Sequence, residues 1–505
     1  MDLFSIESLL LFFSLSIFIF FYLHHQFYTT KTPFKTYPLL GSLPHFILNR
    51  HRFLDWSTDI LRHSPTQTAI FFRPGTVHGV ITANPDNVEH MLKTNFHNYP
   101  KGNRFLFLLH DFLGHGIFNS DGYLWKLQRK TASYEFNTKS LRNFAIQNVT
   151  VEIQTRLIPL LQRASESETV LDLQDVLERF AFDNVCKLAF NVDPACLGGG
   201  STAGDGFMRA FEDATTLSSG RFMSAHHWLW RIRRFLNIAD EKRLKESIST
   251  VHAFADEIIR SRMEAKGPTN TDVDLLSRFM ASEDNSPGFL RDIVISVILA
   301  GRDTTSSALS WFFWILSSRP DVKEKIIQEI KSVRENGESS APFGYEELKE
   351  MNYLLAAISE AMRLYPPVPV DFKKCSNDDV LPDGTVIKRN WFIMYHAYAM
   401  GRMENIWGKD CCEYKPERWF DFDEDGNQVW RSESPFRYPV FHGGPRMCLG
   451  KDMAYIQMKS IVASVLERFE IDAVDKDTCP EHILALTLRM KGGLPVRVRV
   501  TPSQM

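Results

Sequence analysis

The chain has 505 residues, and its 58 lysines and arginines nearly balance 61 aspartates and glutamates. This balance gives no reason to propose nucleic acid as a partner. Length alone would suggest about three domains, but no proline- or serine-rich linker, repeat or low-complexity tract divides the chain. We therefore expect one large folded unit, and the 39 phenylalanines indicate a large apolar interior.

The N-terminal segment is predicted to be a membrane anchor. Residues 9–23 carry no charge, and the apolar character reaches back almost to the start, so about 20 residues are available to span a bilayer. A cleaved signal peptide is the alternative, but the segment lacks a basic start and a small-residue cleavage site. The first basic residues, Lys31 and Lys35, follow the span, and the positive-inside rule therefore places the rest of the chain on the cytosolic side.

Three regions are assigned on this basis. Residues 1–30 are the anchor, residues 31–50 a proline-containing hinge, and residues 51–505 the main domain. Three prolines and a glycine make the hinge too broken for a helix. Cytosolic exposure of the main domain makes disulfides improbable.

Strand signals are few and lie toward the ends of the main domain. Residues 68–83 place β-branched and aromatic runs on either side of a Pro-Gly turn, as a hairpin requires. Strand character returns near residues 386–400 and over 484–500, where residues 491–493 predict a hairpin turn. Most of residues 120–370 has apolar positions at helical spacing. The predicted fold class is mainly α with small β-sheets (α+β).

Residues 286–320 predict one long central helix. A Ser-Pro start and a proline end enclose a stretch that is apolar nearly all round, which is typical of a buried helix. At about 1.5 Å per residue it would extend on the order of 45 Å. A second membrane span is excluded, because four charged side chains in this stretch would each cost about 2.5–3.5 kcal/mol near the bilayer centre.

The middle of this helix departs from helical preference. The segment AGRDTT begins at Ala300 and contains Gly301, Asp303 and Thr304, all poor helix formers. The Thr304 hydroxyl can bond the carbonyl one turn earlier and leave a polar notch beside a carboxylate. Such a notch suits the holding of a small polar ligand and the relay of protons to it. A simple threonine-bonded kink is the alternative interpretation.

Two charged motifs have helical spacing. Glu360 and Arg363 share a helix face, and their apolar surroundings predict a buried pair with Arg418 as a further partner. Trp125 and Arg129, four residues apart, present only hydrogen-bond donors, which suits an anionic group. A solvated helix face is the alternative for the first pair, and a surface cation beside a half-buried aromatic for the second.

One cysteine stands in the glycine-rich stretch FHGGPRMCLG, residues 441–450. Cys448 has neither a CxxC partner nor a histidine pair typical of zinc, so it is a nucleophile, a metal ligand or a buried thiol. Arg446 and the positive end of the helix predicted to follow are expected to lower the pKa of the thiol. A nucleophile would need a base, and no histidine is placed by motif for that role.

Together these motifs resemble the cytochrome P-450 superfamily, in its membrane-anchored plant form. The run FxxGxRxCxG in residues 441–450 is similar to the haem-thiolate loop of that family, and WxxxR, AGxDTT, ExxR and PERW precede it in the expected order. The resemblance covers the chain from about residue 100 to its end. It implies the cytochrome P-450 fold, with a long central helix crossing the haem and an N-terminal transmembrane helix.

The resemblance implies a role for each motif. Cys448 would be the axial ligand to the iron of haem b. Thr304 and Asp303 would be the catalytic pair that relays protons to iron-bound dioxygen. The haem and its loop would be held by Trp125, Arg129, Arg446, Phe441, Gly444 and Gly450. The structural ion-pair triad would be Glu360, Arg363 and Arg418.

Within the superfamily the chain looks most similar to the family 94 fatty-acid ω-hydroxylases. A haem-thiolate monooxygenase of this kind would use O2, and electrons of NADPH passed on by NADPH–cytochrome P-450 reductase, to hydroxylate the terminal or a near-terminal carbon of a fatty acid. Jasmonoyl-amino acid conjugates and a steroid side chain (C-26) are alternative substrates. A haem redox or sensor protein without oxygenation is the alternative of another class.

The resemblance also implies where the protein is located in the cell and which residues line its substrate pocket. The protein would be a monomer held in the endoplasmic reticulum bilayer by a single pass, with a cytosolic catalytic domain and a small lipophilic substrate. By position, the substrate pocket would be lined by Phe105, Phe107, Ala300, Val368, Val370 and Leu486. Lys373 and Lys374 have no assigned role.

Overall fold

The computed structural model describes residues 13–16, 19, 32–38, 40–73, 77–136, 139–198, 202–223, 227–264, 274–281, 286–335, 342–426 and 428–501. The predicted anchor over residues 1–30 lies almost wholly outside these residues. Within them, no helix combines the length and the apolar character needed to cross a membrane. The anchor therefore stays a prediction.

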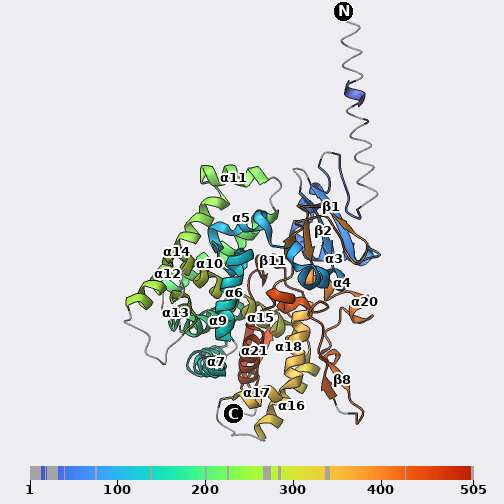
Figure 1. Cartoon of the computed structure of the whole chain (residues 1–505). Helices are drawn as coiled ribbons and strands as arrows, with labels where there is room; N and C mark the ends of the chain where they lie inside the picture. The colour runs from blue at the N-terminus through green and yellow to red at the C-terminus, as the bar shows by residue number, and fades with distance from the viewer. Residues whose placement is uncertain are drawn as a thin grey trace, which may run out of the picture.

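Helices make up most of the described chain, and the largest sheet lies at one side of them (Figure 1). In chain order the described α-helices are α2 (Leu43–Leu48), α3 (Phe53–His63), α4 (Pro85–Glu89), α5 (Gly102–Leu113), α6 (Gly122–Phe136), α7 (Lys139–Glu152), α8 (Ile158–Glu166), α9 (Leu173–Phe190), α10 (Thr202–Gly220), α11 (His227–Leu236), α12 (Asp240–Glu264), α13 (Leu275–Met280), α14 (Pro287–Ile298), α15 (Thr304–Ser317), α16 (Pro320–Glu335), α17 (Tyr345–Glu350), α18 (Asn352–Leu364), α19 (Ala397–Met400), α20 (Glu404–Trp407) and α21 (Lys451–Leu466). This confirms the predicted fold class.

The strands are short. They are β1 (Thr68–Arg73), β2 (Val77–Thr82), β3 (Leu171–Asp172), β4 (Asp371–Lys374), β5 (Asp379–Val380), β6 (Val386–Ile387), β7 (Phe392–Tyr395), β8 (Phe420–Phe422), β9 (Gln428–Trp430), β10 (Phe469–Ala473), β11 (His482–Leu484), β12 (Leu488–Met490) and β13 (Pro495–Val500). The largest sheet has the order β1-β2-β7-β4. Strands β1 and β2 pair antiparallel, with Thr68 opposite Thr82, so the hairpin predicted over residues 68–83 is confirmed.

The predicted central helix is present but interrupted. Helix α14 begins where the Ser286 hydroxyl accepts a hydrogen bond from the Phe289 N–H. It ends in a π-helical turn, Leu299–Asp303, after which α15 continues. The turn widens the helix at the AGRDTT segment, because each π turn holds an extra residue. Helix α15 contacts α9, α18 and α21 and lies among them at the centre of the molecule (Figure 1).

The apolar interior forms two clusters. One packs the β1-β2-β7 side of the sheet against α3, α15, α18 and α21. The other joins α5, α9, α10, α12 and α14. All seven cysteines are free, as expected for a protein without disulfides.

Two local predictions are wrong. The predicted hinge contains a helix, α2, because Pro44 occupies the first helical turn, where its missing N–H breaks no hydrogen bond. Phe46 of this helix is buried in the core. Residues 491–493 do not close a hairpin, because β12 pairs with β11 whereas β13 pairs with β10 and β3. The two glycines in this segment instead carry the chain from one sheet to another.

Candidate active site

A cavity of about 510 Å³ lies between the central helix and the largest sheet. Its lining is mostly apolar and comes from α5, α9, the π turn, α15, strands β4 and β7 and the loop that contains Cys448. Of the residues predicted to form the substrate pocket, those that line this cavity are Phe105, Ala300, Val368, Val370 and Leu486.

Phe107 is the predicted pocket residue that the structure does not bring to the cavity. Its ring lies 5.5 Å from the Trp230 ring, and the guanidinium of Arg231 lies 4.8 Å from its centre. Helix α5 presents Phe105 inward and Phe107 outward, because residues two apart lie on opposite faces of a helix. The two-residue spacing of Phe105 and Phe107 therefore already indicated that they lie on different faces of the helix.

Cys448 lies in the loop that precedes α21, and its side chain opens into the cavity, which lies inside the protein. The Cys448 N–H donates to the Phe441 carbonyl at 2.8 Å, which closes the loop beneath the sulfur. Burial among apolar groups raises the pKa of the Cys448 thiol, although the Gly450 N–H, Arg129 and Lys451 act to lower it. The expectation of a lowered pKa is therefore wrong: burial outweighs the positive groups.

The loop is shaped by Gly444, which has φ +64. A Cβ at this position would lie 1.9 Å from the Leu92 carbonyl oxygen. Only glycine fits both the left-handed backbone and this close approach. Gly450 is the N-cap residue of α21, and the ring of Phe441 packs 5.2 Å from that of Tyr455.

Replacement of Gly444 by alanine is expected to destabilise the protein by about 1–3 kcal/mol from backbone strain alone, with the steric clash adding to it. Denaturant unfolding measures the loss. Gly426→Ala is the matched control, because Gly426 has φ +80 but open space where a Cβ would stand. Equal losses for the two variants would show that contact with Leu92 has no effect.

Trp125, Arg129 and Arg446 gather on one side of the cavity. The Arg446 guanidinium lies 4.3 Å from the centre of the Trp125 ring and pairs with Asp121 at 2.7 Å. Arg129 makes no ion pair with any carboxylate among the described residues, and burial lowers its pKa while Cys448 opposes that shift. A half-buried cation without a partner is suited to an anionic group of a bound molecule.

Thr304 forms the notch that the sequence predicts. Its hydroxyl donates to the Ala300 carbonyl at 2.6 Å, and both residues line the cavity. A Cβ on Gly301 would lie 2.4 Å from a methyl group of Val185, so glycine allows α9 to approach the central helix here. Ala300 is exposed to the cavity although most of this helix is buried.

Asp303 is not among the cavity-lining residues. It is buried and pairs with Arg302, whose other nitrogen lies 2.9 Å from Glu178. Glu178 pairs with Arg489 at 2.8 Å, and Arg489 pairs with the partly exposed Glu212 at 2.6 Å. A ladder of ion pairs thus runs from beneath the notch toward the surface.

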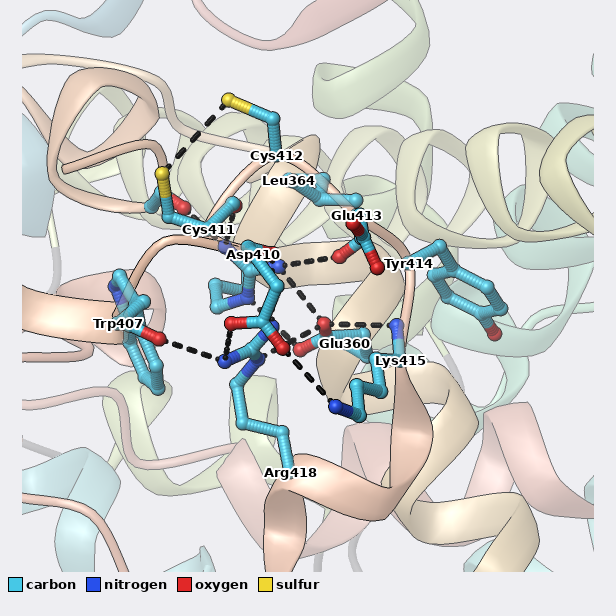
Figure 2. A network of polar contacts seen from close by, with 12 residues as sticks. Glu360, Leu364, Trp407, Asp410, Cys411, Cys412, Glu413, Tyr414, Lys415 and Arg418 are labelled. Atoms are coloured by element: carbon cyan, nitrogen blue, oxygen red, sulfur yellow. Dashed lines mark hydrogen bonds and ion pairs between the residues drawn. The ribbon is translucent and has the colours of Figure 1, made fainter. Parts of the chain in front are cut away.

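Glu360 is the centre of a buried ion-pair network (Figure 2). Both of its oxygens accept hydrogen bonds from Arg363 at 2.8 Å, and Arg418 approaches at 3.3 Å. Glu360 also accepts hydrogen bonds from the Trp419 indole N–H and from the Lys415 backbone N–H. Arg418 also binds Asp410 and the Trp407 carbonyl, so the network joins α18 to the chain after α20.

A second cluster beside the cavity has no counterpart among the predicted site residues. Asp371 of β4 binds Lys101 at 3.1 Å and His442 at 3.3 Å and also contacts Lys373. Burial lowers the pKa of Lys373 to about 7, and burial and Lys373 together lower that of His442 to about 4. In the sequence, only the charged run DFKK of β4 pointed to this cluster, and the residues that contact it, Lys101 and His442, lie far from it along the chain.

Comparison with known proteins adds an independent finding. A family model described as "Cytochrome P450" matches residues 32–494. The chain is 54% identical over 462 residues to cytochrome P450 CYP94D108 of Paris polyphylla, a match that covers 91% of this chain and 90% of that one. It is 46% identical over 477 residues to cytochrome P450 94A2 of Vicia sativa, with 93% and 92% covered. It is 47% identical over 469 residues to cytochrome P450 94B1 of Arabidopsis thaliana, with 92% and 90% covered.

Proposed function

Because the chain belongs to the cytochrome P450 family, as a monooxygenase of the CYP94 family within it, we propose that it hydroxylates the terminal or a near-terminal carbon of fatty acids. The family implies haem, O2, electrons from a reductase and a lipophilic substrate. The observation that supports the proposal best is the position of Cys448, which opens into the same large apolar cavity that Thr304 lines. An apolar cavity with few polar groups is suited to an alkyl chain.

The residues around the cavity fit a haem. One thiol without a zinc-type partner faces the cavity, and Arg129, free of carboxylates among the described residues, stands beside Trp125 and Arg446 to receive propionates. We assign Cys448 as the ligand of the iron in haem b. When bound, the haem supplies the activation of dioxygen and the insertion of one oxygen atom into a C–H bond.

Within this proposal Thr304 and Asp303 move protons, but from different places. Thr304 faces the cavity and its hydroxyl is the group that delivers a proton there. Asp303 lies behind it, and its Oδ2 atom makes no hydrogen bond among the described residues. That oxygen is where a proton would be taken up before Thr304 receives it, with the carboxylate held in place by Arg302.

Thr304→Ala is expected to lower the hydroxylated product formed per NADPH by about tenfold or more, because the hydroxyl that delivers the proton is lost. NADPH would still be consumed, and hydrogen peroxide would take the place of product. Both are measured in the same reaction with reductase. Thr304→Ser retains the hydroxyl and should keep the coupling; an unchanged ratio of product to NADPH in the alanine variant would contradict the role.

The setting of the enzyme is part of the proposal. We place it in the endoplasmic reticulum as a single-pass monomer, with NADPH–cytochrome P450 reductase as the electron donor. Lys126, Lys130 and Lys451 are exposed and lie on the two helices that flank the Cys448 loop. Such a group of lysines is suited to an acidic face of the reductase.

Product analysis tests the substrate. The enzyme, with reductase and NADPH in microsomes, is offered fatty acids, jasmonoyl-isoleucine and hydroxysterols, and the position of the new hydroxyl is identified by mass spectrometry. Terminal or near-terminal hydroxylation of fatty acids supports the proposal. Turnover confined to the conjugate or the sterol, or no hydroxylated product from any of them, would overturn it.

A further inference from the structure

Arg104 of α5 is a cation of the cavity that has no carboxylate partner among the described residues. It is half-buried, lines the cavity, and its guanidinium lies 5.1 Å from the centre of the Phe392 ring. Among the described residues it makes no ion pair, and burial alone lowers its pKa. Removing a guanidinium from water without a counter-charge is costly, so the position calls for an anion.

Arg73, the last residue of β1, lines the same cavity and lies near enough to Arg104 to interact with it electrostatically. It is buried, with its guanidinium 5.6 Å from the centre of the Phe46 ring. Burial and the positive charge of Arg104 together lower the pKa of Arg73 to about 10. The two arginines thus bring like charges together in apolar surroundings.

The other cations of the cavity differ from Arg104. Lys101 is neutralised by Asp371 and Arg446 by Asp121. Arg129 interacts electrostatically with Cys448, on the side where the haem is proposed to bind. Arg104 instead lies over the ring of Phe392, a residue of β7, and Arg73 belongs to β1. Both arginines are therefore on the sheet side of the cavity.

We propose that Arg104, with Arg73 beside it, binds the carboxylate of an aliphatic acid substrate at the sheet side of the cavity, so that the far end of the alkyl chain is presented to Cys448 and Thr304. This inference rests on the proposed function and adds the group that selects an acid over a neutral lipid. Arginine is suited to this role, because its planar fork binds both oxygens of a carboxylate. Anchoring one end of the chain also explains how oxidation can be confined to the other end.

The test compares one acid with its uncharged ester. Dodecanoic acid and methyl dodecanoate are titrated at neutral pH into the purified full-length, haem-loaded protein, and the change of the haem absorption spectrum on binding gives each dissociation constant. We expect wild type to bind the acid about tenfold more tightly than the ester, as a charge-assisted contact provides. Arg104→Met should lose that preference and leave the affinity for the ester unchanged, whereas Arg104→Lys should keep part of it.

Arg231→Met is the matched control, because Arg231 also lies over a phenylalanine ring but on the exposed helix α11. It should leave both affinities unchanged. Equal affinity of wild type for acid and ester would overturn the inference, and terminal hydroxylation by the same preparation would show that the proposed function survives. Loss of haem from Arg104→Met would also overturn it, because the arginine would then hold a propionate. If neither probe bound and neither gave a hydroxylated product, the proposed function itself would be overturned.

Discussion

Replacement of Cys448 by alanine is expected to abolish the strongly red-shifted Soret band that the reduced, carbon monoxide-treated protein should show. That red-shifted band arises only when a thiolate is a ligand of the haem iron. Cys448 is the cysteine that lines the cavity, so no other described thiol stands where it could replace it. Hydroxylation should fall to background in the same variant.

The measurement separates ligand loss from unfolding. Cys479→Ala removes an exposed thiol outside the cavity and should keep the full band and activity. Circular dichroism of Cys448→Ala reports whether the helices remain, and total haem is measured after extraction. A retained red-shifted Soret band in a folded Cys448→Ala protein would refute the assignment, as would the absence of that band from folded, haem-loaded wild type.

The motifs could be read from the sequence because their geometry is local. The four-residue spacing of Trp125 and Arg129, and the threonine bond across one turn at Thr304, follow from the helix repeat alone. Helices α15 and α21, which carry or follow two of these motifs, contact each other at the centre of the molecule (Figure 1).

Contacts between distant parts of the chain were not predictable in this way. Glu178 and Arg489 are 311 positions apart, and neither belongs to a motif. Arg73 and Arg104 likewise come from a strand and a helix whose packing only the fold determines. The pKa of Cys448 was misjudged because charges are visible in a sequence, whereas the burial that opposes them is not.

Glu360→Ala is expected to cost about 3–5 kcal/mol of folding free energy, because it leaves the fully buried guanidinium of Arg363 without its carboxylate. That loss is a large part of the roughly 5–15 kcal/mol that stabilises a folded protein. The variant should therefore accumulate poorly and carry little haem. Denaturant unfolding and the yield of haem-loaded protein measure the effect.

A second variant keeps the test decisive if Glu360→Ala does not accumulate. Arg418→Met leaves the Glu360–Arg363 pair intact and removes the contacts of Arg418 with Glu360 at 3.3 Å, with Asp410 at 3.0 Å and with the Trp407 carbonyl at 2.7 Å, so the loss of folding free energy should be smaller than for Glu360→Ala but measurable. Glu481→Ala breaks a solvent-exposed pair with Lys491 and should leave unfolding unchanged, because water screens such pairs. Comparable unfolding curves for all three variants would contradict a structural role for the buried network. A normal unfolding curve with lost haem would instead place Glu360 in cofactor retention, since the carboxylate would then support the haem loop without supporting the fold.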